Sequence, residues 1–206
     1  MPEALLVTAI RWGSVGPLLL TSLAIMGSPG PATISLVAAS SAYGLRRSLL
    51  YLIGIIAGTT VVLGAVAAGI TAALLAVPAI GSILIAISVI YILWLAYHIA
   101  TAPPLSESTA SKAPSLVGGA LLGVANPKAW VAIAAVFASA HLSSSATTDA
   151  VAKIAVLIMM IIVINATWLL AGQSLAPLLQ DPRQARVVNA LLAVGLVVAT
   201  AFAVLH

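Results

Sequence analysis

Two short polar motifs interrupt long apolar stretches of the sequence, and their residue types could bind a small charged molecule. The first is Ser28-Pro29-Gly30-Pro31 and the second is Asn126-Pro127-Lys128. Proline has no N–H group and clashes with the carbonyl four residues earlier, so each motif is expected to break a helix and free backbone carbonyls. The half-helix after each break begins with free N–H groups and a partial positive charge. Each break therefore offers both donors and acceptors.

A zwitterion matches this combination of groups. Free N–H groups at a helix start can bind a carboxylate, whereas freed carbonyls, the Ser28 hydroxyl and the Asn126 amide can accept from an ammonium. Inside a bilayer, such breaks are tolerated only where the freed groups are buried in protein or line a cavity. The alternative is a simple proline kink that neighbouring helices satisfy. Because the two breaks occupy equivalent places in the chain, we favour a substrate-binding site formed by both motifs.

Two further polar side chains lie deep in the apolar stretches. Lys128 is predicted near the middle of a span, where a charge costs about 2.5–3.5 kcal/mol on insertion scales. A substrate carboxylate could be its counterion, and the alternatives are snorkelling or a bond to backbone carbonyls of the first span. Asn165 joins the candidate substrate-binding residues, although an intramembrane asparagine more often joins helices. All four acidic residues fall in predicted loops or at the N-terminus, so no ion pair is predicted within a span.

The composition indicates an integral membrane protein. Of 206 residues, 63% are hydrophobic and 6% are charged, whereas soluble domains carry about 25% charged residues. The sequence has no cysteine, and its three histidines lie far apart, so no disulfide, metal site or cofactor is predicted. The basic residues form no cluster of the kind that binds nucleic acid. We expect the lipid bilayer of the cytoplasmic membrane to surround the chain.

At about 20 residues per span, the chain has room for roughly six transmembrane helices. The apolar runs place them at Ser14–Ala42, Ser48–Ala76, Ile80–Ala100, Leu116–Ala140, Ala150–Ala176 and Val187–Leu205. The first and the fourth contain the proline motifs, and the polar residues 101–115 form the predicted linker. No cleavage signature follows the first residues, so the first apolar run is expected to remain as a span of one transmembrane domain, residues 1–206.

The two halves of the chain, about 1–100 and about 116–206, have the same layout. Each has a broken span, a long span that stops at Pro78 or Pro177, and a plain span. Because three is odd, the second half must insert upside down relative to the first, as in the inverted repeats of secondary transporters. The predicted fold class is therefore an all-α polytopic membrane protein with a 3+3 inverted repeat.

The basic residues predict the orientation, since cytoplasmic loops carry an excess of lysine and arginine. Loops after the first, third and fifth spans hold Arg46, Arg47, Lys112, Arg183 and Arg186. The opposite side holds Arg11 and Lys153, so both termini are predicted to lie outside. Aromatic residues near the span ends fit interfacial belts, and they are Trp12, Tyr43, Trp94, Tyr97 and Trp168.

Several short motifs, in their order along the chain, resemble those of the LysE/RhtB family of amino-acid exporters. They are Pro29-Gly30-Pro31, Gly44-Leu45-Arg46, Gly54 with Gly58, Tyr91-Ile92-Leu93-Trp94-Leu95 and Asn126-Pro127-Lys128. The chain departs from the family pattern at Ser48, where a second glycine is usual, and at Ala138-Ser139-Ala140-His141-Leu142, where a Pro-Gln-Phe element is common. Gly54-x-x-x-Gly58 and Gly119-x-x-x-Gly123 could also mark close helix packing, or simply reflect a glycine-rich composition.

The resemblance implies a six-span exporter, typically driven by the proton gradient, that moves amino acids or similar small metabolites outward. Related branches of the family make an exporter of metal cations or of another solute the alternative. A remote alternative is an intramembrane hydrolase with Ser28 as nucleophile and His98 or His141 as base, but we do not expect an enzyme. A homodimer is left open.

Overall fold

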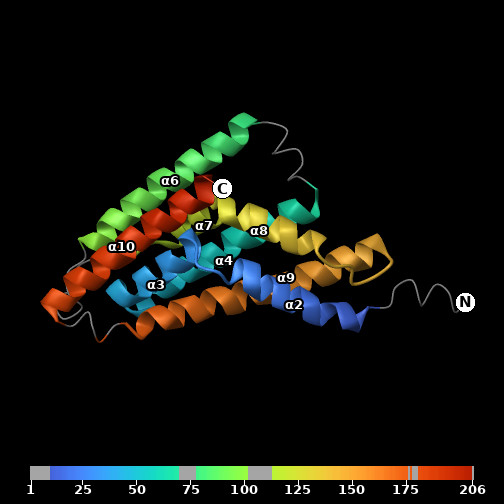
Figure 1. Ribbon diagram of the computed structural model, residues 1–206, viewed down its shortest axis with the longest axis horizontal. Helices are drawn as coiled ribbons and strands as arrows, with labels where there is room; N and C mark the ends of the chain where they lie inside the picture. The colour runs from blue at the N-terminus through green and yellow to red at the C-terminus, as the bar shows by residue number, and fades with distance from the viewer. Residues whose placement is uncertain (1–9, 70–77, 102–112, 176, 178–180, 206) are drawn as a thin grey trace, which may run out of the picture.

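The computed structural model describes residues 10–69, 78–101, 113–175, 177 and 181–205, and every regular element in this part of the chain is helical. The helices are α2 (Trp12–Met26), α3 (Pro31–Tyr43), α4 (Leu45–Ala67), α6 (Pro78–Ala100), α7 (Leu116–Ala125), α8 (Pro127–Ala138), α9 (Ala146–Gln173) and α10 (Pro182–Leu205). Figure 1 shows them lying lengthwise in one bundle, with α6 and α10 side by side and antiparallel along one flank.

Both proline motifs divide one apolar stretch into two helices. α2 and α3 meet at an angle of 69°, and α7 and α8 meet at 59°. Pro31 and Pro127 each lie in the first turn after the break, where the missing N–H has no intrahelical partner to lose. Gly30 and Asn126 before them are extended, as expected for a residue that precedes proline. The prediction that these two stretches break at their proline motifs is confirmed.

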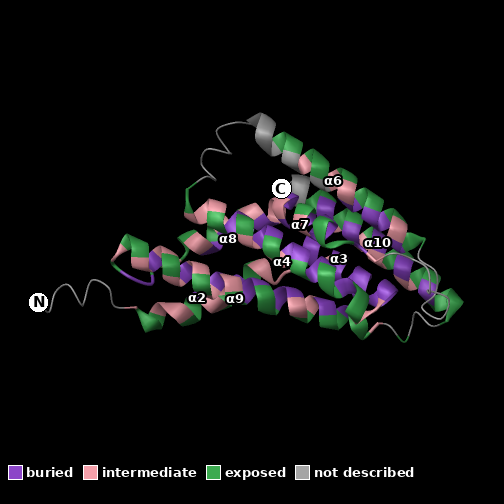
Figure 2. Ribbon diagram, turned by 180° about the vertical axis from the view of Figure 1, so that it is seen from behind, coloured by how far each residue is buried: buried purple, intermediate pink, exposed green. Residues whose placement is uncertain are grey.

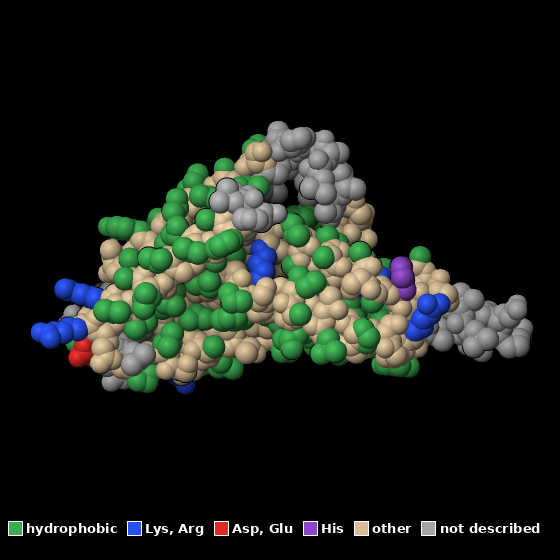
Figure 3. Space-filling model, viewed as in Figure 1, with side chains coloured by type: hydrophobic (Ala, Val, Ile, Leu, Met, Phe, Trp, Pro, Cys, Tyr) green, Lys and Arg blue, Asp and Glu red, His purple; other side chains and the backbone are tan. Residues whose placement is uncertain are grey.

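Within the described residues, three helices are long and apolar enough to cross a membrane: α4, α9 and the 182–202 part of α10. Counting each bent pair as one span gives up to five. The remaining predicted span corresponds to α6, of which Ile85–Ala100 is a shorter apolar helix. The surface agrees with a bilayer environment, because large apolar side chains are exposed along the helices and basic side chains lie mainly towards the two ends of the bundle (Figure 3). The 3+3 inverted repeat stays a prediction.

Three of the predicted boundaries are wrong by four residues or more, and one of these is the start of α10, at Pro182 rather than near Val187. α4 ends at Ala67 rather than near Ala76, because Gly69 adopts a positive φ of 74° that ends the helix in a turn. α9 begins at Ala146 rather than near Ala150, because Ser145 caps it by accepting from the Thr148 N–H. Residues 70–77 and most of the predicted linker, 102–112, lie outside the described residues.

Glycines bring α4 and α7 into backbone contact. A Cβ at Gly58 would lie 2.3 Å from the Ala120 carbonyl oxygen, and one at Gly123 would lie 2.7 Å from the Ile55 carbonyl oxygen. Gly54 and Gly119 are equally close to the facing backbone. Only residues without a side chain allow such an approach. Both glycine pairs therefore form one helix interface between the two halves of the chain.

The long helices α4 and α9 each pack against the broken span of the other half of the chain. α4 of the first half packs on α7 and α8 of the second, whereas α9 of the second half packs on α2 and α3 of the first. α4 and α9 also contact each other. Both breaks are thereby gathered around α4 and α9.

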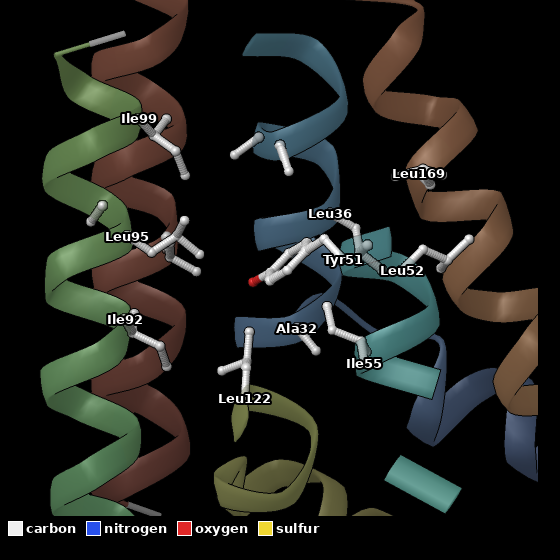
Figure 4. Packing of buried hydrophobic residues seen from close by; sticks show 14 of the residues in the cluster. Ala32, Leu36, Tyr51, Leu52, Ile55, Ile92, Leu95, Ile99, Leu122 and Leu169 are labelled. Carbon is white, nitrogen blue, oxygen red and sulfur yellow. The ribbon is translucent and has the colours of Figure 1, made fainter. Parts of the chain in front are cut away.

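Along the bundle, one apolar cluster packs on each side of the helix breaks. Buried residues line the helix faces turned inward (Figure 2). The first cluster is built around Tyr51, Ile55 and Leu169 (Figure 4), and the second contains Val62 and Ile161. On α4 the interval between the clusters holds Thr59, and on α9 it holds Asn165. Packing therefore places these two polar residues at the level where the helices break.

Candidate functional site

A cavity of about 50 Å³ lies where the two breaks meet α4 and α9. Its walls include Gly30 and Thr33 from the first break, Asn126 and Lys128 from the second, and Asn165 of α9. Thr59 of α4 and apolar side chains of α2, α8 and α9 complete it. The fold thus brings residues from both halves of the chain to one cavity.

The Lys128 ammonium reaches from the start of α8 to the break in the other half. Its Nζ donates to the Ser28 carbonyl, to the Ser28 hydroxyl at 2.8 Å and to the Pro29 carbonyl at 3.1 Å. These acceptors occupy all three donors of an ammonium. No acidic side chain among the described residues bonds to Lys128, so only dipoles compensate its charge. The bond to backbone carbonyls of the first span, one of the alternatives for Lys128, is therefore present.

Gly30 provides the space that Lys128 occupies. A Cβ on Gly30 would lie 2.6 Å from Cδ and 3.1 Å from Nζ of Lys128. The backbone at Gly30 is extended and open to any residue, so space rather than conformation requires glycine here. The Gly30 N–H donates to the Thr33 hydroxyl at 2.8 Å, and this hydroxyl donates back to the Gly30 carbonyl at 3.1 Å. This pair of bonds fixes the start of α3.

Protein groups already bond several carbonyls around the breaks. The Ile25 carbonyl accepts from the Ser28 hydroxyl at 2.8 Å. The Gly27 carbonyl accepts from the Trp168 indole at 3.1 Å, and the Val124 carbonyl accepts from the Trp130 indole at 2.7 Å. Trp168 was expected in an interfacial belt, but its indole contacts the first break. A ligand ammonium would therefore need another acceptor in the cavity.

Three buried side chains that line the cavity keep unused hydrogen-bonding groups. Asn126 accepts from the Lys128 N–H at 3.2 Å through its carbonyl oxygen, which leaves its NH₂ group unbonded. Asn165 donates to the Ile161 carbonyl at 2.8 Å, which leaves its side-chain oxygen unbonded. The Thr59 hydroxyl bonds to no described residue. The cavity therefore offers a donor, an acceptor and a hydroxyl.

The candidate residues divide into those that line the cavity and those that shape it. Gly30, Asn126, Lys128 and Asn165 line it. Ser28 and Pro29 act on it through their bonds to Lys128, whereas Pro31 and Pro127 begin the helices beside it.

Thr59 and Thr33 are polar cavity residues that were not among the predicted site residues. A threonine inside an unbroken helix usually bonds to a carbonyl of the preceding turn, as Thr60 does to Ile56 at 2.8 Å. No motif in the sequence distinguishes Thr59 from Thr60.

A buried ion pair lies at the start of α9. Asp149 and Lys153 are both buried, and their charged atoms are 2.7 Å apart. Asp149 also accepts from the backbone N–H groups of Leu142 at 2.5 Å and Ser143 at 3.3 Å. The prediction that Asp149 lies in a loop is wrong, because the early start of α9 places Asp149 in the helix, one turn before Lys153. The Lys153 ammonium also lies 4.8 Å from the centre of the Phe137 ring.

The geometry around Ser28 does not suit hydrolysis. Its hydroxyl donates to a carbonyl and accepts from Lys128, whose ammonium has no lone pair with which to act as a base. His98 bonds to the Trp94 carbonyl at 2.9 Å, and His141 lies 3.8 Å from Asp149, so neither histidine contacts Ser28. The arrangement favours reversible binding of a small polar molecule over covalent chemistry.

Comparison with known proteins gives a consistent result. The family model described as LysE type translocator matches residues 23–206. Proteins from Salmonella choleraesuis strain SC-B67 and Salmonella typhimurium strain LT2, each named cysteine/O-acetylserine efflux protein, are 40% identical to this chain over 86 residues. The match covers 41% of this chain and 44% of each relative, so it spans less than half the length of these proteins. No solved structure gives a significant match.

The family match covers far more of the chain than the relatives do, because it extends from the first break through the last helix. The family consists of transporters and not of enzymes, in agreement with the geometry at Ser28. The chain therefore belongs to the LysE type translocator family.

Proposed function

We propose that this chain is a secondary-active exporter of small amino acids, which bind in the cavity between the two helix breaks. The observation that carries the proposal is the position of Lys128. Its cation lines a partly open cavity with no acidic partner among the described residues, and a substrate carboxylate would supply the missing charge. The efflux proteins to which part of the chain is similar are named for an amino acid and an amino-acid derivative, which supports this substrate class.

The unused groups of the cavity suit the two charged ends of an amino acid. Lys128 and the NH₂ group of Asn126 would hold the carboxylate. The side-chain oxygen of Asn165 would accept from the ammonium, since Ser28, Lys128 and the two indoles already bond carbonyls of the breaks. The substrate carboxylate would compete with Ser28 and Pro29 for the donors of Lys128.

This competition gives a route to alternating access. Without substrate, Lys128 joins the second break to the first through residues 100 positions away. A carboxylate that takes over its donors would weaken this link and let the two halves move relative to each other. The exchanged packing of α4 and α9, and the antiparallel α6 and α10, support a 3+3 inverted repeat around this point. Transport outward, with both termini outside and the proton gradient as the energy source, completes the proposal.

Export of metal cations is the weaker candidate. Divalent metals need carboxylate, imidazole or thiolate ligands close together. Among the described residues no three such side chains gather, and the cavity presents the cation of Lys128.

Transport by purified protein in proteoliposomes tests the proposal. Vesicles loaded with radiolabelled serine, alanine, cysteine, leucine or lysine should lose the small neutral amino acids fastest when a proton gradient is imposed. Empty vesicles provide the background. Gradient-dependent flux of none of these compounds would contradict the proposed function.

A further inference from the structure

Thr59 has a fixed place in the wall of the cavity. It lies on the unbroken helix α4, between the two apolar clusters, and only 7% of it is exposed. The neighbouring Gly58 packs against the backbone of α7, and a Cβ on Gly123 would lie 2.8 Å from the Thr59 backbone nitrogen. The close contact between α4 and α7 therefore holds Thr59 rigidly beside the second break.

The Thr59 hydroxyl differs from those of several other threonines in the helices. Thr60, Thr167 and Thr200 each donate to a carbonyl one turn earlier. The Thr59 hydroxyl has no such bond, although only 7% of the residue is exposed and it lines the cavity. Its oxygen is not fully buried, because it reaches the cavity. The hydroxyl is therefore available to bond to a ligand in the cavity.

The remaining groups of the cavity indicate which part of the ligand reaches Thr59. Lys128, Asn126 and Asn165 account for the carboxylate and the ammonium under the proposed function. The other walls near α8 and α9 are apolar, with Ala132 and Ile164 among them. A polar atom on a short substrate side chain would therefore find its partner at Thr59.

We propose that Thr59 determines specificity by hydrogen-bonding a polar atom on the substrate side chain. The exporter then prefers small amino acids whose short side chain carries a hydroxyl, thiol or ester oxygen over apolar ones of equal size. This inference rests on the proposed function, because it assigns the third contact of the same bound amino acid.

The physical basis is the cost of an unpaired hydroxyl. A site that hydrogen-bonds a substrate hydroxyl disfavours the analogue that lacks it, because the protein group is then left without a partner. With valine at position 59, this penalty disappears for an apolar substrate and appears for a hydroxylated one. The cavity keeps its size, because valine and threonine have nearly the same shape.

The test compares export of serine and alanine, which differ by one hydroxyl, by the full chain in proteoliposomes. The measured quantity is the ratio of their kcat/KM values. Thr59→Val should lower the serine-to-alanine ratio by about 2- to 10-fold, the effect of one neutral hydrogen bond. Thr59→Ser keeps a hydroxyl and should keep the ratio. Thr60→Val is the matched control, because the Thr60 hydroxyl bonds to Ile56, and this variant should leave the ratio unchanged.

Several outcomes would overturn the inference. If Thr59→Val slows serine and alanine equally, Thr59 contacts a part common to both, or acts on the fold. An equal change of ratio in Thr60→Val would point to a general effect on α4. If the valine variant is poorly folded, Thr59→Ala and Thr59→Ser make the same comparison, and equal ratios in these two would contradict the assignment. A wild-type protein that exports neither amino acid would instead refute the proposed function.

Discussion

The Nζ atom of Lys128 lies 2.8 Å from the hydroxyl of Ser28, although the two residues are 100 positions apart in the sequence. This contact joins the two helix breaks of the protein at one side of the cavity. It also occupies a donor of the ammonium that we assign to the substrate carboxylate. Ser28 and the substrate are therefore competitors for the same group, and the first prediction follows from this competition.

Ser28→Ala should strengthen substrate binding. The variant removes one competing acceptor of Lys128 and leaves the backbone carbonyls of Ser28 and Pro29 in place. We expect the dissociation constant for serine to fall by about 2- to 10-fold, the effect of one hydrogen bond. Isothermal titration calorimetry on detergent-solubilised protein measures it. Weaker binding in the variant would show that Ser28 assists the substrate and does not compete with it.

Gly58→Ala should destabilise the protein. The added methyl group would lie 2.3 Å from the Ala120 carbonyl oxygen and force α4 away from α7. Overpacking of this kind costs about 1–3 kcal/mol, and it should lower the Tm in a thermal unfolding experiment. Gly64→Ala on the same helix is the control, because nothing lies within 4 Å of a Cβ there. Equal Tm values for the two variants would contradict the assigned interface.

Trp168→Phe should lower the free energy of unfolding, because the indole stabilises the backbone at the first helix break. Phenylalanine cannot donate to the Gly27 carbonyl, which then loses its bond of 3.1 Å. This contact is half-buried, so its loss should cost about 0.5–1.5 kcal/mol, the net contribution of one neutral hydrogen bond. Trp12→Phe is the control, because Trp12 is 78% exposed. Chemical unfolding in mixed micelles compares the two variants, and a Trp168→Phe protein as stable as Trp12→Phe would refute the role of the indole.

The buried ion pair at the start of α9 should respond non-additively to mutation. Asp149→Asn leaves the Lys153 charge buried without its partner, which typically costs about 3–5 kcal/mol. Lys153→Met in the Asp149→Asn background removes that charge and should restore part of the loss. A double-mutant cycle on unfolding free energy measures the coupling. Strictly additive effects would mean that the pair contributes no interaction of its own.

Much of the fold could be predicted from the sequence, because the strongest signals are local. Apolar runs, prolines and glycines locate the helices and both breaks without reference to tertiary structure. The errors lie at helix ends, where a single residue can set the boundary. Gly69 ends α4 early because its φ is positive, and Ser145 starts α9 early because it caps the helix. The second error also concealed the Asp149–Lys153 pair.

The candidate site could be predicted only in part. The proline motifs that break the helices can be recognised in the sequence, and so can Lys128, because it is a charged residue in an apolar stretch. The roles of Thr59 and Trp168 depend on which helix face turns towards the breaks, and this follows from the packing of α4 on α7 and of α9 on α3. No local pattern in the sequence contains that information.

Binding of serine and serinamide to the wild type and to Lys128→Met tests the central claim most directly. Serinamide keeps the ammonium and the hydroxyl of serine but has no carboxylate. The wild type should bind serine about 10- to 100-fold more tightly than serinamide, as expected for a bond between charged groups. Lys128→Met should bind the two compounds with similar affinity. A preference for serine of unchanged size in Lys128→Met would contradict the assignment of the carboxylate to Lys128.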